Sequence, residues 1–157
     1  MKNIYLYNTI IGQIRIVDNG EEIIEIEINE EREEQEEGYR FEETALIKRT
    51  HEQLDEYFKG ERKTFDLPLH LEGTEFQKKV WKALLEIPYG EIRSYKDVAE
   101  RIGCPKGYRA VGNANNKNNI IIVIPCHRVI GANGKLVGYA CGLDIKEKLL
   151  GIEKILI

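Results

Sequence analysis

The sequence predicts an α+β protein of two domains, in which an antiparallel sheet with one helix precedes a mostly helical unit that contains a helix-turn-helix. Three observations support this class. β-Rich runs separated by tight turns come first, helix caps and apolar stripes come later, and the local net charge changes sign between them. The 157 residues, 42 % hydrophobic and 32 % charged, suffice for a folded core and exclude a disordered or collagen-like chain.

Three short β-rich runs begin the chain and predict an antiparallel meander: residues 4–7, 13–17 and 23–28. Turns are expected at residues 8–9 (Asn-Thr) and 18–20 (Asp-Asn-Gly). Acidic and apolar residues alternate along 22–28, which indicates a strand with one buried face and one wet face. The acidic stretch 30–37 is expected to form a solvated loop.

A helix is expected over residues 44–58, because apolar residues recur there at roughly helical spacing and Gly60 follows as a stop. Residues 63–73 contain Leu-Pro-Leu and are expected to be extended and to join the two domains. The predicted domains are therefore an α/β unit at residues 1–72 and a second unit at residues 73–157.

Three helices are expected at the start of the second unit: residues 74–87, 95–102 and 106–116. Thr74 and Gln77 have the spacing of a capping box, Ser94 can cap the second helix, and Gly103 can end it in a left-handed conformation. The last two helices and their glycine-containing turn have the layout of a helix-turn-helix. An ordinary pair of short helices is the alternative.

The rest of the chain contains one long apolar run and two local signals. Residues 120–124 are five consecutive apolar residues, which predicts a strand or extended segment buried on both faces. Asn-Gly at 133–134 predicts a hairpin turn, and Asp144 is expected to cap a last helix.

The net charge of −4 is unevenly distributed along the chain. Residues 1–72 hold 19 acidic and 9 basic side chains, whereas residues 73–157 hold 8 acidic and 14 basic ones. Because phosphate neutralisation supplies most non-specific DNA affinity, the basic half predicts a surface that faces a polyanion. Chance clustering of solvated charges is the alternative.

The three cysteines include no Cys-x-x-Cys pair, which argues against a disulfide framework and for a reducing compartment. No apolar run reaches the length of a membrane helix, and the first residues do not look like a leader. The sequence therefore predicts a cytoplasmic protein without membrane association.

Cys126 is the candidate nucleophile, because it follows the apolar run directly and precedes His127 and Arg128. Adjacent cationic or imidazole groups lower the pKa of a thiol. A small buried hydrophobe is the alternative for Cys126. A zinc site that combines it with Cys104, Cys141 and His127 is disfavoured, because the spacings match no metal pattern.

Several ordered motifs resemble one family. Residues 124–131 read Ile-Pro-Cys-His-Arg-Val-Ile-Gly, and residues 109–114 read Arg-Ala-Val-Gly-Asn-Ala. Together with Ser94-Tyr95, Gly138-Tyr139 and Glu153, these motifs closely resemble the O6-alkylguanine-DNA alkyltransferases over about residues 76–153. The resemblance implies a ribonuclease-H-like first domain, matched more weakly, and a winged-helix-like second domain.

The resemblance implies that an alkyl group moves irreversibly from guanine O6 in DNA to Cys126, so that each molecule acts once. Thymine O4 stays open as a second source of the alkyl group. His127 would take the thiol proton through a water, and Glu153 would hold the imidazole in the right tautomer. Asn118 would tie together the turns that support the site. No metal or other cofactor is implied.

The resemblance also implies that the target nucleotide is flipped out of the duplex while a helix occupies the minor groove. Arg109 would fill the gap, and Tyr95 would crowd the phosphate of the flipped nucleotide. The carbonyls of Cys126 and Val129 would accept from the guanine amine. The other residues assigned to DNA or base binding are Ala110, Arg128, Tyr139 and Ala140. The partner is double-stranded DNA containing O6-alkylguanine, bound by a monomer.

The sequence departs from the family at residues 139–142, where Tyr-Ala-Cys-Gly replaces the usual Tyr-Ser-Gly-Gly. Cys141 therefore puts the width of the pocket in doubt. Two other classes stay open: a DNA-binding or lesion-binding module without transfer activity, and a cysteine hydrolase or redox protein. Cys126 disfavours the first, because such relatives lack the nucleophile. The basic half and Arg109 disfavour the second.

Overall fold

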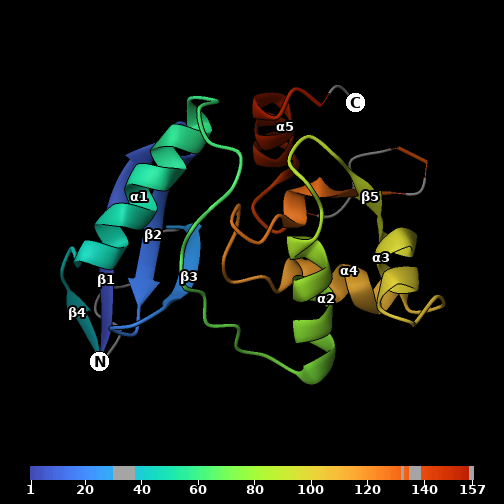
Figure 1. Ribbon diagram of the computed structural model, residues 1–157, viewed down its shortest axis with the longest axis horizontal. Helices are drawn as coiled ribbons and strands as arrows, with labels where there is room; N and C mark the ends of the chain where they lie inside the picture. Colours follow the sequence, from blue (N-terminus) through green and yellow to red (C-terminus); the bar gives the residue numbers. More distant parts are fainter. Residues whose placement is uncertain (30–37, 132, 135–138, 156–157) are drawn as a thin grey trace. The chain divides into compact units, whose positions relative to one another are not determined.

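The computed structural model describes residues 1–29, 38–131, 133–134 and 139–155. The chain divides into two compact units, residues 1–71 and 72–157, which are described separately (Figure 1). The first holds a sheet and one helix and the second is mostly helical, which confirms the predicted α+β class. No helix within the described ranges is long and apolar enough to cross a membrane.

A four-stranded sheet forms the first unit: β1 (Lys2–Thr9), β2 (Gly12–Asp18), β3 (Ile23–Ile28) and β4 (Tyr39–Phe41). The order is β3-β2-β1-β4, and the antiparallel β1–β2 and β2–β3 pairs confirm the predicted meander. β4 pairs in parallel with β1 and was not predicted. The expected turn at residues 8–9 is wrong, because Thr9 still pairs with Gly12. Gly12 has a φ of 108°, which lets the chain reverse over residues 10–11.

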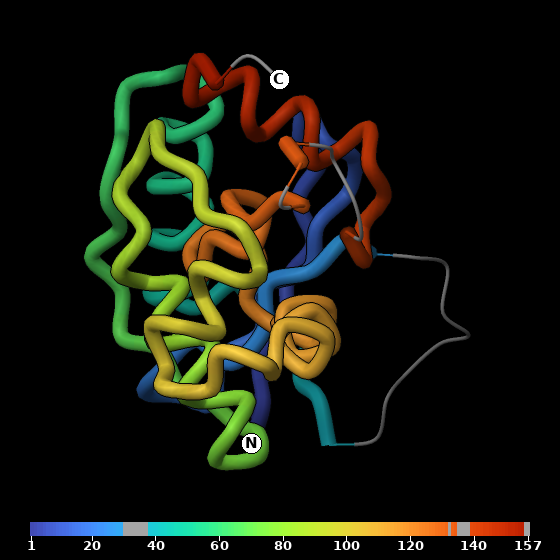
Figure 2. Tube along the Cα trace, turned by 90° about the vertical axis from the view of Figure 1, so that its right-hand side faces the viewer, coloured from blue at the N-terminus to red at the C-terminus, as the bar shows by residue number. Residues whose placement is uncertain are grey.

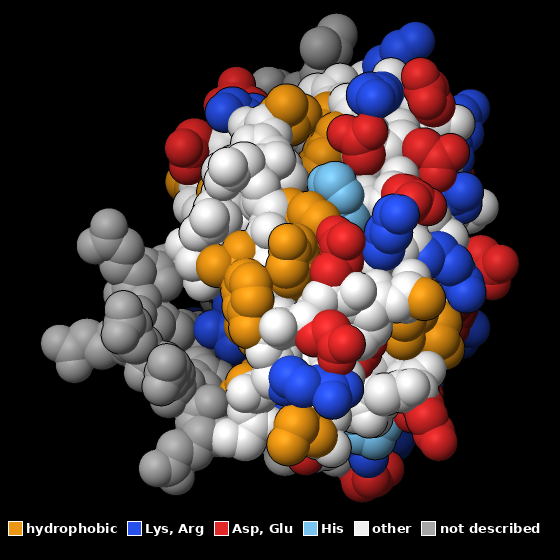
Figure 3. Space-filling view, turned by 90° about the vertical axis from the view of Figure 1, so that its left-hand side faces the viewer, with side chains coloured by type: hydrophobic (Ala, Val, Ile, Leu, Met, Phe, Trp, Pro, Cys, Tyr) orange, Lys and Arg blue, Asp and Glu red, His pale blue; other side chains and the backbone are white. Residues whose placement is uncertain are grey.

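Helix α1 (Ala45–Phe58) packs against the sheet, as Figure 1 shows. Thr44 caps it by accepting a hydrogen bond from the Ile47 N–H, and Gly60 follows its end with a φ of 75°. The expected loop at 30–37 lies outside the described residues. On the face drawn in Figure 3, acidic, basic and hydrophobic side chains are interspersed.

The linking segment is extended where it passes β3. The Ile23 N–H donates to the Pro68 carbonyl at 2.8 Å, and the His70 N–H donates to the Ile23 carbonyl at 2.9 Å. Leu69 thereby forms a parallel bridge with Ile23. The end of the first unit is thus fixed by backbone pairing to its own sheet.

The second unit contains four α-helices, one 3-10 helix and two short strands among its described residues: α2 (Glu75–Leu85), β5 (Arg93–Ser94), α3 (Tyr95–Arg101), α4 (Tyr108–Asn116), η1 (Cys126–Arg128), β6 (Val129–Ile130) and α5 (Leu143–Ile152). Capping boxes begin α2 at Thr74 and α3 at Ser94. The buried Trp81 indole donates to the Ala114 carbonyl at 2.9 Å and joins α2 to α4. Figure 2 shows α4 nearly end-on, beside the other helices of this unit.

The apolar run at 120–124 is buried as predicted, but it is not a strand. Ile122 has a φ of 73°, and the Val123 N–H donates to the Ile121 carbonyl at 2.8 Å. The Ile124 N–H donates back to the Ile120 carbonyl at 3.1 Å, which closes a tight turn. This turn brings the chain from the end of α4 to η1 while its side chains stay in the core.

Two expectations near the C-terminus change. Gly142, with a φ of 104°, occupies the cap position of α5, while Asp144 lies inside the first turn and does not cap it. At 133–134 the Gly134 N–H donates to the Gly131 carbonyl at 2.9 Å, but most of the expected hairpin lies outside the described residues. β6 pairs in parallel with β5.

Candidate active site

Cys126 begins η1, directly after the buried turn, and only 3 % of it is exposed. Burial raises the pKa of its thiol. Hydrogen bonds from Asn118 and Tyr139 and the charge of Lys146 act in the opposite direction without overcoming burial. The resting group is therefore a thiol, and a nucleophilic thiolate requires a base close by.

His127 and Glu153 form a fully buried pair, with His127 Nε2 2.6 Å from Glu153 Oε2. Burial alone would raise the pKa of Glu153, but the interaction with His127 and hydrogen bonds from Arg128 and the Gly90 N–H lower it to about 2. The carboxylate is ionised and accepts a hydrogen bond from the Nε2–H group, which leaves the lone pair of the ring on Nδ1. Burial lowers the pKa of His127, so the imidazole is neutral and can accept a proton.

Arg128 was expected to bind DNA, but its side chain is buried. It is 6 % exposed, and its Nε and Nη2 donate to Glu153 at 2.8 and 3.3 Å while Nη1 donates to the Ile87 carbonyl at 2.7 Å. The Gly90 N–H also donates to Glu153, at 3.0 Å. Since its donors point inward, Arg128 helps to hold the carboxylate that faces His127.

Two asparagines fix the backbone around the thiol. Asn118 donates to the Ile124 carbonyl and accepts from the Ile120 N–H, both at 2.9 Å, so it spans the buried turn. Asn115 donates to the Cys126 carbonyl at 3.3 Å, and the Val129 N–H donates to the same oxygen. Two donors already engage this carbonyl, which argues against its expected role toward a guanine amine.

Asn115 was not predicted as a site residue. It lies on the buried face of α4 with Val111 and Ala114. The i, i+3, i+4 spacing of these residues could have revealed a polar group turned inward.

The outer face of α4 contrasts with this interior. Arg109 and Ala110 are exposed, and Tyr108 is 47 % exposed. Tyr95, at the start of α3, is half-buried beside Gly112 of α4. Burial raises the pKa of Tyr95, and a charge on Cys126 would raise it further.

The remaining predicted residues lie on the C-terminal side of Cys126. Val129 is buried and its carbonyl accepts from Lys146 Nζ at 2.5 Å. Tyr139 is 8 % exposed, with the Lys146 ammonium 5.9 Å from its ring centre, whereas Ala140 is exposed. Lys146 was missed by the sequence analysis, although it shares a face of α5 with Leu149 and Leu150.

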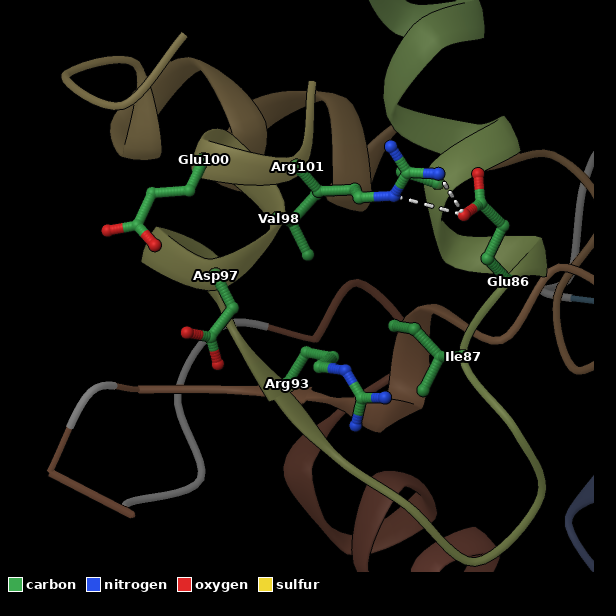
Figure 4. A pocket seen from close by; sticks show the side chains of 8 residues that line it. Glu86, Ile87, Arg93, Asp97, Val98, Glu100 and Arg101 are labelled. Atoms are coloured by element: carbon green, nitrogen blue, oxygen red, sulfur yellow. Dashed lines mark hydrogen bonds and ion pairs between the residues drawn. The ribbon is translucent and has the colours of Figure 1, made fainter. Parts of the chain in front are cut away.

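A surface pocket lies apart from the thiol, between α2, α3 and the segment that joins them (Figure 4). The Arg101–Glu86 ion pair, at 2.7 Å, crosses one side of it, and Cys126 is not among its lining residues. Within the described ranges, no group of three His, Cys, Asp or Glu side chains could hold a metal ion.

The fold and the site define a two-unit protein whose second, mostly helical unit holds a buried cysteine next to a buried His–Glu pair. Two models of one family match almost the whole chain. The ribonuclease-like domain of 6-O-methylguanine DNA methyltransferase matches residues 4–71, and its DNA binding domain matches residues 75–155. The chain belongs to this family.

Individual relatives carry the same family name. A methylated-DNA–protein-cysteine methyltransferase of Methanosarcina barkeri is 66 % identical over 102 residues, which is 65 % of each chain. The constitutive enzyme of Bacillus subtilis is 57 % identical over 114 residues, 72 % of this chain and 69 % of its own. The chain thus spans just under two thirds of the Methanosarcina relative.

Solved structures extend the similarity over both units. The O6-methylguanine methyltransferase of Mycobacterium tuberculosis is 42 % identical and covers 98 % of this chain and 93 % of its own, with a TM-score of 0.87. The same Mycobacterium protein in complex with DNA has a TM-score of 0.90 over 97 % of this chain and 92 % of its own.

Proposed function

We propose that this protein repairs DNA by direct reversal, moving an alkyl group from guanine O6 irreversibly to its own Cys126. The observation that carries this proposal is the buried thiol beside the His127–Glu153 pair, whose Nε2–Oε2 distance is 2.6 Å. Membership of the methyltransferase family supports it. The alkyl group expected to be transferred is a methyl group, and O4-alkylthymine is the second substrate to test.

In the proposed reaction the Cys126 proton passes through a water to His127 Nδ1, while ionised Glu153 stabilises the imidazolium. The thiolate sulfur attacks the alkyl carbon, a carbon–sulfur bond forms, and the carbon–O6 bond breaks. Its electron pair leaves with guanine, which takes a proton from solvent. The His127 imidazolium returns its proton to solvent, and the protein keeps a neutral thioether. Because the chain has no step that removes the alkyl group, each molecule reacts once.

DNA is the proposed partner, supported by the DNA complex of the Mycobacterium relative and by the 14 basic side chains of residues 73–157. The exposed face of α4 would enter the minor groove of the duplex, with Arg109 replacing the flipped nucleotide. Tyr95, half-buried toward Cys126, would contact the flipped nucleotide. The Val129 carbonyl, Tyr139 and the Ala140 N–H would bind the base.

The proposed division of labour assigns DNA binding and alkyl transfer to residues 73–157. The first unit, residues 1–72, would not contribute reacting groups. The protein would act as a cytoplasmic monomer without a metal or other cofactor.

The test is a titration of increasing protein against an excess of duplex DNA that carries one O6-methylguanine per molecule. Restored guanine should reach a plateau at one per chain and should not rise further with time. Repeated turnover would contradict the proposal. Binding of the modified duplex without restored guanine would instead identify a lesion-binding protein.

A further inference from the structure

Asn115 carries a buried amide oxygen that the proposed reaction does not yet use. Its side chain lies on the inner face of α4 and is 2 % exposed. The amide nitrogen donates to the Cys126 carbonyl at 3.3 Å, but the amide oxygen, Oδ1, accepts no hydrogen bond from the residues that the structure describes. A buried amide oxygen without a donor is costly. Such an atom gives reason to look for the group that it would meet.

The contact to Cys126 also fixes where this oxygen lies. The two polar atoms of an asparagine amide are bonded to the same carbon and share one plane, so holding Nδ2 on the Cys126 carbonyl keeps Oδ1 close to that carbonyl. Cys126 carries the candidate nucleophile, and the Val129 carbonyl, three residues further on, is proposed to bind the base. The unpaired oxygen therefore lies beside the groups proposed to bind guanine, on the buried face of α4.

The exocyclic amine of guanine lacks a second acceptor in the proposed function. It has two hydrogens, and the Val129 carbonyl is proposed to accept one of them. The Cys126 carbonyl was expected to accept the other, but Asn115 Nδ2 and the Val129 N–H already donate to it. A carbonyl oxygen has two lone pairs, so both are in use. The second hydrogen of the amine needs another acceptor close to this carbonyl.

We propose that Asn115 is a specificity-determining residue of this site, whose Oδ1 accepts a hydrogen bond from the exocyclic amine of the flipped guanine, an inference that rests on the proposed function. Asparagine suits both contacts, because one end of its amide donates to the protein and the other end accepts from the base. Thymine has no exocyclic amine, so the same contact favours guanine over thymine as the target base.

The expected size follows from the strength of one hydrogen bond. A single neutral hydrogen bond is worth roughly a two- to tenfold change in a rate or binding constant. O6-methylhypoxanthine is the same target base without the amine. The unaltered chain should therefore repair O6-methylguanine faster than O6-methylhypoxanthine, and removal of Oδ1 should reduce this ratio of rates by about threefold or more.

The test compares Asn115→Leu with Asn116→Leu, the exposed asparagine that follows it on α4. Single-turnover repair rates are measured with two duplexes that differ only in the target base, O6-methylguanine or O6-methylhypoxanthine. The ratio of the two rates is the readout. A loss of positioning slows both reactions alike, and the cost of flipping each base belongs to the DNA, so neither changes the ratio between chains.

Leucine has the branched shape of asparagine and still covers the Cys126 carbonyl, so no new acceptor opens toward the base. Asn115→Leu should lower the ratio by about threefold or more, while Asn116→Leu should keep the ratio of the unaltered chain. An unchanged ratio in Asn115→Leu overturns the inference. Equal rates with both duplexes in the unaltered chain also overturn it.

A second measurement leaves Asn115 in place and decides the matter if Asn115→Leu does not fold, as judged by Trp81 fluorescence. In a crystal structure of Cys126→Ala bound to a duplex with O6-methylguanine, Asn115 Oδ1 should lie within about 3.2 Å of the amine nitrogen. A separation above about 4 Å overturns the inference. Failure of the unaltered chain to restore guanine would refute the proposed function, whereas the ratio of rates tests Asn115 separately.

Discussion

The Cys126 site and the outer face of α4 belong to the same unit, but polar side chains are buried in the first and exposed on the second. In the site, His127, Glu153, Arg128 and Lys146 are buried and meet partners within about hydrogen-bond distance. On α4, Arg109 is exposed to solvent. Proton transfer requires groups that are already desolvated and fixed, whereas a contact to DNA requires a side chain that can extend toward the duplex. Substitutions should therefore separate chemistry from DNA binding.

The largest difference between the loss of methyl transfer and the loss of DNA binding is expected for Cys126→Ala. This variant should lose methyl transfer completely and keep its affinity for duplex DNA, because transfer depends on one sulfur and binding on the surface. Restored guanine and duplex affinity are measured on the same preparation, with Cys104→Ala as the exposed-cysteine control. Transfer at the unaltered rate in Cys126→Ala would refute the assignment.

The next largest effect is expected for His127→Gln, which removes the proton acceptor and leaves the Arg128–Glu153 pair intact. The single-turnover transfer rate should fall by about 10²- to 10⁴-fold, the usual contribution of a general base. Duplex affinity should not change. His70→Gln, an exposed histidine in the first unit, is the control. A similar loss in both variants would mean that His127 has no special role.

Glu153→Gln tests whether the buried carboxylate of Glu153 stabilises the folded protein. Removing this carboxylate leaves Arg128 buried without its charge partner, which should lower the free energy of unfolding by about 3–5 kcal/mol. In the folded chain the pKa of Glu153 is about 2, below its value of about 4.3 when unfolded. Its stabilisation is therefore present above about pH 4.3 and is lost as the pH falls toward 2.

The measurement for Glu153→Gln is denaturant unfolding followed by fluorescence of Trp81, the single tryptophan, which is buried in the second unit. Glu147→Gln, an exposed position on α5, is the control. Equal stability of the two variants across this acid range would show that the carboxylate contributes nothing to folding.

A substitution on the exposed face of α4 should slow repair of duplex DNA without slowing alkyl transfer itself. Arg109→Ala should slow repair of duplex DNA at least about tenfold and leave the reaction with free O6-benzylguanine unchanged, because a free base requires no flipping. Both rates are measured with Arg101→Ala as a control for an exposed arginine on α3. Equal slowing with both substrates would contradict the wedge role. Duplex affinity should also fall as salt rises.

The smallest effect is expected for Ser94→Ala at the start of α3. The Ser94 hydroxyl accepts from the Asp97 N–H at 2.9 Å, and loss of such a cap costs about 1 kcal/mol. The change in the free energy of unfolding is measured by Trp81 fluorescence during denaturant unfolding. The rate with free O6-benzylguanine should be unaltered, and a changed rate would show that the cap also positions Tyr95.

Local signals were sufficient for much of the fold. Thr74 and Ser94 each cap a helix as predicted, because a cap depends on residues within one turn of the chain. The run at 120–124 was misjudged, since the left-handed φ of Ile122 is imposed by the core around it and not by its own preference. β4 is only three residues long and pairs with a strand distant in sequence, so it left no periodic signal.

The residues of the candidate site likewise include some that local sequence predicts and some that only tertiary contacts place. Cys126 and His127 are adjacent, so their proximity follows from the sequence. The place of Arg128 depends on Glu153, 25 residues later, and on Ile87, 41 residues earlier. Lys146 reaches Val129 across 17 residues. Contacts over such separations are set by tertiary packing, and for that reason Arg128 was assigned to DNA and Lys146 was missed.

The central claim is that the alkyl group ends on the sulfur of Cys126. The most direct measurement is to incubate the protein with duplex DNA containing one O6-methylguanine, then to weigh the intact chain and map its peptides by mass spectrometry. We expect each chain to gain one CH₂, located on Cys126, with guanine restored in the DNA. Loss of the methyl group from DNA while Cys126 stays unmodified would contradict it.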